Sequence, residues 1–337
     1  MVARIIDFSK RRPVIAALAF LGVCAAVWLS VSEAYTWVVW NRLIAETQTI
    51  CDAPRSGRDI DATWSFPFKD TTCTVEVTID AGELELASRI DAGRAFRTPI
   101  YPRARHLPHF VSSQAESRFI RDLADEFRRI AEEMSLDEDE HLELIVCAVQ
   151  AIPYGETEGD VLLPIEVVAN GRGMCSEKSV LLAALLVREG YGTAMWALPT
   201  QKHVAVGVRS DWVRFDDSEY AYIETTRPAF IGHVSSEMKA RGPIARHPVL
   251  MRVSEGKVYT AGEQIDYILE RLTRRPSLGD RGRRAFPQYR TYDAYYSLKA
   301  VENDVTLELA RFAMQNTHDR ARVYRTLVSS DALSIAY

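Results

Sequence analysis

Three residues of the types used by nucleophilic enzymes follow one another along the chain: Cys175, His203 and Glu224. Cys175 comes where a glycine-containing loop turns into a helix, and a helix N-terminus favours the negative charge of a thiolate. His203 could act as its base, and Glu224 as the acid that orients the base. Residue types alone are a weak signal, because a chain of 337 residues holds several cysteines, histidines and glutamates.

The elements expected around these residues would bring them together. A helix is predicted from Cys175 to Gly190, and it is apolar on every side over residues 180–187, which predicts burial. Strand-like runs follow at residues 193–198, 203–208, 212–215 and 221–225. Their connections are too short for helical crossovers, so the sheet should be antiparallel, with His203 and Glu224 about 5 Å apart on adjacent strands. The predicted fold class is α+β.

Five motifs, taken in order, resemble the transglutaminase-like superfamily, and most closely its prokaryotic, membrane-anchored members. They are QAIPY at 150–154, LPIE at 163–166, GMCSEK at 173–178, HVAVGV at 203–208 and YIETT at 222–226. The resemblance covers residues 62–233, about half the chain. It implies a papain-like core in which the helix that carries the cysteine packs on an antiparallel sheet. It also implies Cys175 as nucleophile, His203 as base and Glu224 as orienting acid.

The resemblance implies a cysteine acyl-transfer enzyme that acts on a protein or peptide substrate. We expect no cofactor and no metal. Release of the thioester to water would make a protease or amidase, and release to an amine a transglutaminase. The chain departs from the family pattern at Met174, where an Asp is common, and at Ser176, which is not an acid. A second hypothesis therefore stays open: a catalytically silent module that serves as a tethered binding or assembly protein.

Several alternatives concern single residues. Asp216 and Asp217 are rival orienting acids, and Glu177 suits a role in holding the loop or capping the helix. The backbone N–H of Cys175 is the expected oxyanion donor, with Tyr154 or Gln150 as candidates for a second. The remaining candidate metal ligands do not have the spacing of a zinc site: His106, His109, His233 and His247.

The N-terminus has the features of a membrane anchor. Residues 1–12 carry Arg4, Lys10, Arg11 and Arg12 against Asp7, and residues 14–31 contain no charge. As a helix this run spans about 27 Å, close to the hydrocarbon core of a bilayer, and Tyr35, Trp37 and Trp40 follow it. We expect a single-pass cell-membrane protein with a cytoplasmic N-terminus and the bulk of the chain periplasmic or extracytoplasmic. The alternative is a signal peptide cleaved near residues 32–34.

The rest of the chain is assigned more coarsely. Strands are expected within residues 62–80, a connecting loop at 95–115, two helices up to Pro153 with a Ser135–Glu138 capping box, and a loop at 155–174. Beyond residue 234 we expect a hairpin of residues 249–253 and 257–260, a helix at 264–272, an Arg-rich stretch at 271–290 and one or two helices at 293–329. The expected divisions are a basic tail (1–12), an anchor (13–34), a stem (35–61), the transglutaminase-like domain (62–233) and an extension (234–337).

Composition excludes several classes. The chain is 47% hydrophobic and 26% charged, as is usual for a globular protein, which excludes disordered and collagen-like chains. A net charge of −5 argues against nucleic acid as a partner; the oligomeric state is not indicated. Five cysteines are too few for a disulfide scaffold. Cys24 lies in the apolar run and Cys147 on an apolar helix face, while a Cys51–Cys73 bridge is expected in an oxidising compartment.

Overall fold

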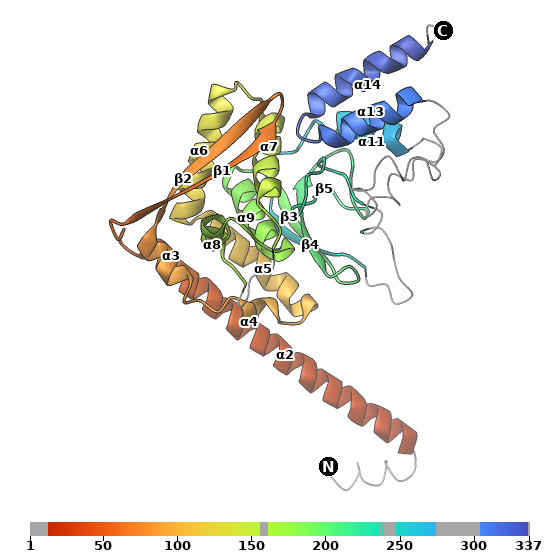
Figure 1. The fold of residues 1–337 in the computed structure, drawn as a ribbon. Coiled ribbons are helices and arrows are strands. Elements are labelled where there is room, and N and C mark those ends of the chain that lie inside the picture. The colour runs from red at the N-terminus through yellow and green to blue at the C-terminus, as the bar shows by residue number, and fades with distance from the viewer. Residues whose placement is uncertain (1–12, 156–160, 236–237, 239–246, 274–303, 336–337) are drawn as a thin grey trace.

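The computed structural model describes residues 13–155, 161–235, 238, 247–273 and 304–335. In this part of the chain, eleven helices and two antiparallel sheets form an α+β fold (Figure 1), which confirms the predicted class. The basic tail at residues 1–12 and most of the Arg-rich stretch at 271–290 lie outside the described residues.

The first helix, α2 (Pro13–Asp52), is 40 residues long and projects away from the rest of the chain (Figure 1). Its most apolar window has a mean hydropathy of 1.8 and is not buried. The helix is thus long and apolar enough to cross a membrane, a property that signal sequences share. From Thr36 onward α2 packs against the fold, with Trp40 and Leu43 buried. The predicted anchor (13–34) and the first part of the predicted stem, up to Asp52, therefore form one continuous helix, and the last residues of the stem belong to β1.

The C-terminal half of α2 packs against two helices in a stretch where the sequence predicts a loop. α4 (Gly93–Phe96) and α5 (Ile100–Ala115) fill residues 95–115, so that prediction is wrong. The many prolines and charged residues of this stretch obscure the helical spacing of its apolar residues, so the sequence does not predict a helix here. Pro102 lies in the first turn of α5, where its missing N–H costs little, and Pro108 is tolerated inside the helix. The face that α5 buries provides the compensation; it consists of Leu107, Phe110, Val111, Gln114 and Ala115.

A two-stranded hairpin, β1 (Asp59–Phe68) and β2 (Thr71–Asp80), confirms the strands expected at residues 62–80. α3 (Ala81–Ala87) follows it, and α6 (Arg118–Glu133) and α7 (Glu138–Ala151) pack beneath it as the two predicted helices. The capping box at the start of α7 joins Asp137 and Glu140, not Ser135 and Glu138 as predicted. Ser135 instead makes the turn between the helices at a φ of 54°.

The central helix α9 (Cys175–Arg188) packs against a four-stranded sheet. The sheet order is β5-β4-β3-β6, antiparallel throughout. Its strands are β3 (Thr193–Leu198), β4 (His203–Arg209), β5 (Tyr220–Ile223) and β6 (Val249–Ser254). Helices α5, α6 and α7 also contact α9, and residues 180–186 are buried as predicted, while Val187 at the end of the predicted run is half-buried.

Three local predictions are wrong. Residues 212–215 form a turn with one isolated bridge, between Arg214 and Ala221, and not a strand. Residues 257–260 make isolated bridges to Tyr191 and Ser210, and β6 pairs with β3 instead of forming a hairpin with them. The loop expected at 155–174 contains the short helix α8 (Pro164–Asn170). Each of these segments is too short for the spacing of its apolar residues to identify its secondary structure or its pairing partner.

The segment after residue 233 is attached to the fold. β6 is an outer strand of the main sheet, so the expected boundary at 233 does not coincide with the end of that sheet. α11 (Gly262–Thr273) confirms the predicted helix, and α13 (Asp304–Gln315) and α14 (Arg320–Ile335) are the two helices at the C-terminal side. Arg320 reaches back to Glu143 of α7 at 2.5 Å, and the Tyr259 hydroxyl donates to the same carboxylate at 2.6 Å.

All five cysteines are free thiols, so the predicted Cys51–Cys73 bridge is wrong. Cys51 lies in the last turn of α2, where its sulfur donates to the carbonyl of Thr47. Cys73 lies on β2 and contacts the sulfur of Met134 at the end of α6 at 3.5 Å. The two thiols thus face different elements, and a count of cysteines along the chain could not reveal that.

Candidate active site

Cys175 is the first residue of α9 and is half-buried. Met174 at the N-cap offers no side-chain acceptor to the helix. The carboxylate of Glu177 instead accepts the N–H of Met174 at 2.7 Å and that of Leu162 at 3.0 Å, and it is fully buried. This confirms that Glu177 holds the loop. The sulfur of Cys175 is thereby fixed at the positive end of a 14-residue helix, beside the first N–H groups of that helix.

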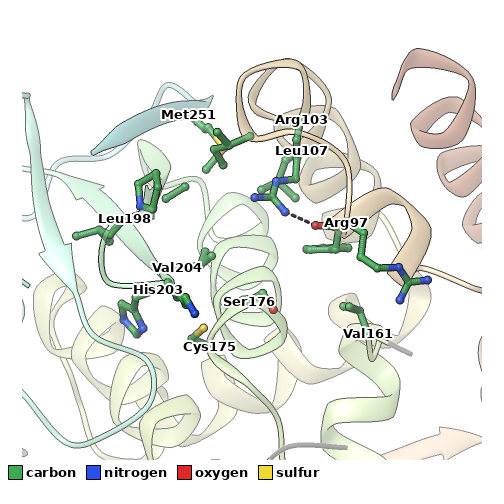
Figure 2. A pocket seen from close by; sticks show the side chains of 15 residues that line it. Arg97, Arg103, Leu107, Val161, Cys175, Ser176, Leu198, His203, Val204 and Met251 are labelled. Carbon is green, nitrogen blue, oxygen red and sulfur yellow. Dashed lines mark hydrogen bonds between the residues drawn. The ribbon is translucent and has the colours of Figure 1, made fainter. Parts of the chain in front are cut away.

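His203 begins β4, and Glu224 directly follows the end of the neighbouring strand β5. Nε2 of His203 is 3.2 Å from Oε2 of Glu224, and their side chains are 9% and 3% exposed. The two atoms form an ion pair whose alignment is poorer than that of a hydrogen bond. Because Nε2 faces the carboxylate, Nδ1 is left for the thiol, and Figure 2 shows His203 beside Cys175. The structure therefore brings all three predicted residues together.

The carboxylate of Glu224 is held in place by its own neighbours. Oε1 accepts the backbone N–H groups of Thr225 at 3.0 Å and Thr226 at 2.9 Å, and the Thr226 hydroxyl at 2.6 Å. Oε2 accepts the Tyr222 hydroxyl at 3.0 Å and faces His203. One oxygen is thus saturated by the turn after β5, and the other is directed at the imidazole.

These contacts set the protonation of the pair. Burial opposes a charge on His203, but the contacts with Cys175 and Glu224 outweigh it and raise the pKa of His203 to about 9. Burial alone would raise the pKa of Glu224, yet the interactions with His203 and Thr226 hold it well below its usual range. Both groups are therefore charged at neutral pH, an imidazolium facing a carboxylate.

Gln150, a candidate oxyanion donor, has a different role. Its Nε2 donates to the carbonyls of Glu224 at 2.8 Å and Ala229 at 3.0 Å, and its Oε1 accepts the N–H of Ala229 at 3.2 Å. With its amide fully engaged, Gln150 positions the strand end that carries Glu224 and cannot serve as the second donor. The other candidate, Tyr154, is 55% exposed and forms an isolated β-bridge with Gly173.

A buried cation lies one turn beyond the cysteine. Lys178 is fully buried, and its Nζ donates to the carbonyls of Gln150, at 3.2 Å, and Ile152 at the end of α7. Burial lowers its pKa to about 8, although the nearby Glu224 opposes the shift. Lys178 thus satisfies carbonyls at the end of α7 and ties that helix to α9.

A cluster of aromatic rings covers the carboxylate side of the site. Trp196 of β3 contacts Phe215 with ring centroids 5.0 Å apart, and Phe215 contacts Tyr222 at 5.3 Å. Tyr222 in turn donates its hydroxyl to Glu224. These rings exclude water from the His203–Glu224 pair, which strengthens their attraction.

Cys175 and His203 open into a cavity of about 460 Å³ (Figure 2). Its walls come from α4, α5, the start of α9, the β3–β4 turn and β6. The lining includes Cys175, His203, Arg103, Leu107, Leu198 and Met251. The volume suits a short peptide segment, and the thiol of Cys175 lies on its wall.

The rival residues lie elsewhere. Asp216 and Asp217 are exposed in the turn before β5, at φ values of 53° and 56°, whereas Glu224 is the acid beside His203. Over the ranges that the structure describes, no group of three or more His, Cys, Asp or Glu side chains could hold a metal ion.

Sequence reasoning missed several residues of the site. Tyr222 and Thr226 flank Glu224 in the YIETT motif, and Lys178 ends the GMCSEK motif, so the signal was present but without an assigned role. Arg103 could not be found at all, because its segment was predicted to be a loop.

No family model, curated protein or solved structure matches this chain.

Proposed function

We propose that this chain is a membrane-anchored, extracytoplasmic cysteine acyl-transfer enzyme with a papain-like, transglutaminase-like core that acts on amides of proteins or peptides. The observation that supports it most is the buried His203–Glu224 pair, 3.2 Å apart, at the wall of a cavity that also exposes Cys175. A structural cysteine would need neither an imidazole beside it nor an oriented carboxylate behind that imidazole.

In the proposed mechanism, the imidazolium of His203 stabilises the thiolate of Cys175. The thiolate attacks the amide carbonyl, and His203 donates its proton to the nitrogen of the leaving amine as the C–N bond breaks. A thioester with Cys175 remains. The neutral imidazole then takes a proton from the attacking water or amine, and the thiolate leaves. A general acid–base of this kind contributes about 10²–10⁴-fold to the rate.

The backbone N–H of Cys175 is the proposed donor to the oxyanion. Within the described part of the chain, the N–H groups of Cys175 and Ser176 make no hydrogen bond, as expected for the first turn of a helix without a capping side chain. Donors of this kind are worth about 10²–10³-fold in rate. The Met174 departure from the family pattern thus leaves donors available instead of removing a member of the triad.

Thiol labelling of the full chain in detergent tests the proposal. We expect iodoacetamide to alkylate Cys175 at pH 7 at least tenfold faster than it alkylates free cysteine, because an adjacent imidazolium favours the reactive form of a thiol. The His203→Ala variant should lose this difference. Mass spectrometry of the Cys175 peptide reads the reaction separately from the other four thiols. Equal rates for Cys175 and free cysteine would favour the second hypothesis, a catalytically silent tethered binding module.

A substrate screen decides the fate of the thioester. Peptide amides are incubated with and without a primary amine, and products are followed by mass. If the free acid is the only product, the enzyme is a peptidase or amidase. If conjugates form that depend on the amine, it is a transglutaminase. In either case the Cys175→Ala variant should give no product.

A further inference from the structure

We propose that Arg103 forms an anion subsite in the cavity beside Cys175, so that the acyl donor is a peptide that carries a carboxylate near the reacting carbonyl. This inference rests on the proposed function and names its substrate class. Three features of Arg103 support it: the backbone holds its guanidinium in place, no described carboxylate pairs with it, and apolar side chains line the space between it and Cys175.

Arg103 is held in place by the backbone. It lies in the first turn of α5, half-buried, and its Nη1 donates to the carbonyl of Phe96 at the end of α4. Figure 2 shows this hydrogen bond and places the guanidinium over the cavity, across from Cys175 and Ser176. A guanidinium fixed at one edge still presents its other N–H groups, and these form a planar fork suited to a carboxylate.

The charge of Arg103 has no counter-charge in the described part of the chain. Its neighbour in the lining, Arg97, is paired with Asp91 at 3.6 Å, but Arg103 makes no ion pair with a described carboxylate. None of the described residues that line the cavity is Asp or Glu, and Lys202 is a further cation in the lining. Burial lowers the pKa of Arg103. A half-buried, uncompensated cation is costly, and a bound carboxylate would offset that cost.

The rest of the lining suits the apolar part of such a ligand. Aliphatic side chains surround the space between Arg103 and Cys175: Ile100, Leu107, Val161, Leu198 and Met251. A peptide that places its carboxylate on Arg103 would thus extend apolar groups along these walls and bring a neighbouring amide to the sulfur. The carboxylate of this peptide lies either elsewhere on the acyl side of the scissile bond or in the side chain of the residue beside that bond.

Two alkylating reagents that differ by one charge test the subsite without a substrate. Iodoacetate is an anion and iodoacetamide is neutral, and both are small enough for the cavity. The ratio of their rates at Cys175 is measured by mass spectrometry on the full chain at low ionic strength. We expect Arg103→Gln to lower the ratio of iodoacetate to iodoacetamide about tenfold, since it removes a nearby cation, and Arg103→Lys to keep most of it.

The matched control is Arg105→Gln, two residues along the same helix, where Arg105 pairs with Glu33 and is exposed. It should leave the ratio unchanged. In the wild type, succinate should slow iodoacetamide labelling of Cys175, and the neutral succinamide should not. This measurement also covers the case in which Arg103→Gln does not fold.

The outcomes separate the two proposals. If both reagents react with Cys175 no faster than with free cysteine, the proposed function fails. If both react fast but Arg103→Gln keeps the wild-type ratio, or succinate gives no protection, the anion subsite is overturned while the proposed function stands.

Discussion

Glu224 shows how the site depends on single hydrogen bonds. Four donors fix its carboxylate, three on Oε1 and the Tyr222 hydroxyl on Oε2, and only Oε2 faces the imidazole. The carboxylate therefore has two effects on His203, because it orients the ring and also keeps the ring protonated.

Replacing Glu224 with Gln removes the charge and keeps the shape. With a pKa of about 9, His203 stays an imidazolium through neutral pH and becomes neutral as the pH rises past that value. The Glu224→Gln variant should lower this pKa, so less imidazolium remains to stabilise the Cys175 thiolate. The pH at which fast Cys175 alkylation begins should therefore move up by about one to three pH units. The measurement is the pH–rate profile of iodoacetamide labelling between pH 5 and pH 10.

The matched control for this change is Tyr222→Phe. It removes one hydrogen bond to Oε2 and leaves the negative charge, so the pH at which its fast alkylation begins should lie close to that of the wild type. A Glu224→Gln profile that superimposes on the wild-type profile would mean that the carboxylate does not govern the imidazolium.

Residue-level prediction from sequence succeeded where a motif combined types and spacing. Cys175 and His203 were expected to begin a helix and a strand and do so, whereas Glu224 was expected inside a strand and directly follows β5. Gln150 was given the wrong role, since its three hydrogen bonds cross to residues 224 and 229. No local pattern reports a contact over more than 70 positions.

At the scale of elements, the packing of α2 on α4 and α5 forms the outer wall of the site. Trp40 lies at the centre of this contact, with its ring 5.4 Å from that of Phe96 and 5.8 Å from that of Phe110, and its Nε1 donates to Thr98 at 3.2 Å. Because Phe96 also lines the cavity, this contact connects α2 to the wall of the site.

Truncation of Trp40 should therefore destabilise the protein. We expect Trp40→Ala to lower the free energy of unfolding by about 3–5 kcal/mol, from lost burial and the cavity left behind. The control is Trp37→Ala on the same helix, where the ring is 58% exposed and the cost should be under about 0.5 kcal/mol. Urea unfolding of the full chain in detergent gives both values, and equal costs would contradict this role of Trp40.

The C-terminal helices depend on one buried contact. Arg320 of α14 pairs with Glu143 of α7 at 2.5 Å, and Tyr259 shares the same carboxylate. The Arg320→Met variant leaves that carboxylate buried without its cation, which costs about 3–5 kcal/mol. We expect faster hydrogen exchange in α11 and α14.

An exposed arginine on the same helix provides the comparison. Arg325→Gln should leave exchange in α11 and α14 at the wild-type rate. Protection that survives Arg320→Met would show that apolar contacts alone hold these helices, among them the buried Val323 and Leu327.

The sequence predicted the elements with a strong local signal, such as the periodic α6 and β4 and the continuously apolar α9, and missed those whose stability depends on tertiary contacts. α5 contains two prolines and many charges, yet it is a helix because Leu107, Phe110 and Val111 are buried against its neighbours. β6 was predicted as a strand, but its partner β3 lies more than 50 residues earlier, and pairing over that distance has no local signature.

At the scale of the whole molecule, the proposed anchor fixes which side of the membrane the site faces. In right-side-out vesicles, we expect a membrane-impermeant maleimide to label Cys175 without lysis, because the positive tail should stay in the cytoplasm. A cysteine introduced by Ser9→Cys should be labelled only after permeabilisation. The reverse pattern would contradict the orientation.

The same samples distinguish an anchor from a signal peptide. An uncleaved chain should remain in the membrane after alkaline washing and keep the mass of all 337 residues. A chain shortened near residue 34 and released from the membrane would show that the apolar run is a signal peptide.

The continuity of α2 limits which substrates can reach the proposed site. The apolar run ends at Val31, and Trp40 is already docked on the fold, a rise of about 14 Å along an unbroken helix. With α2 in the bilayer as we propose, the helix is a rigid spacer, and the nucleophile stands at a set height above the lipid surface. Amides that never come to this height above the membrane cannot react with Cys175, whatever the sequence around them. Lengthening α2 by whole turns should raise the site above the membrane and change which amides react.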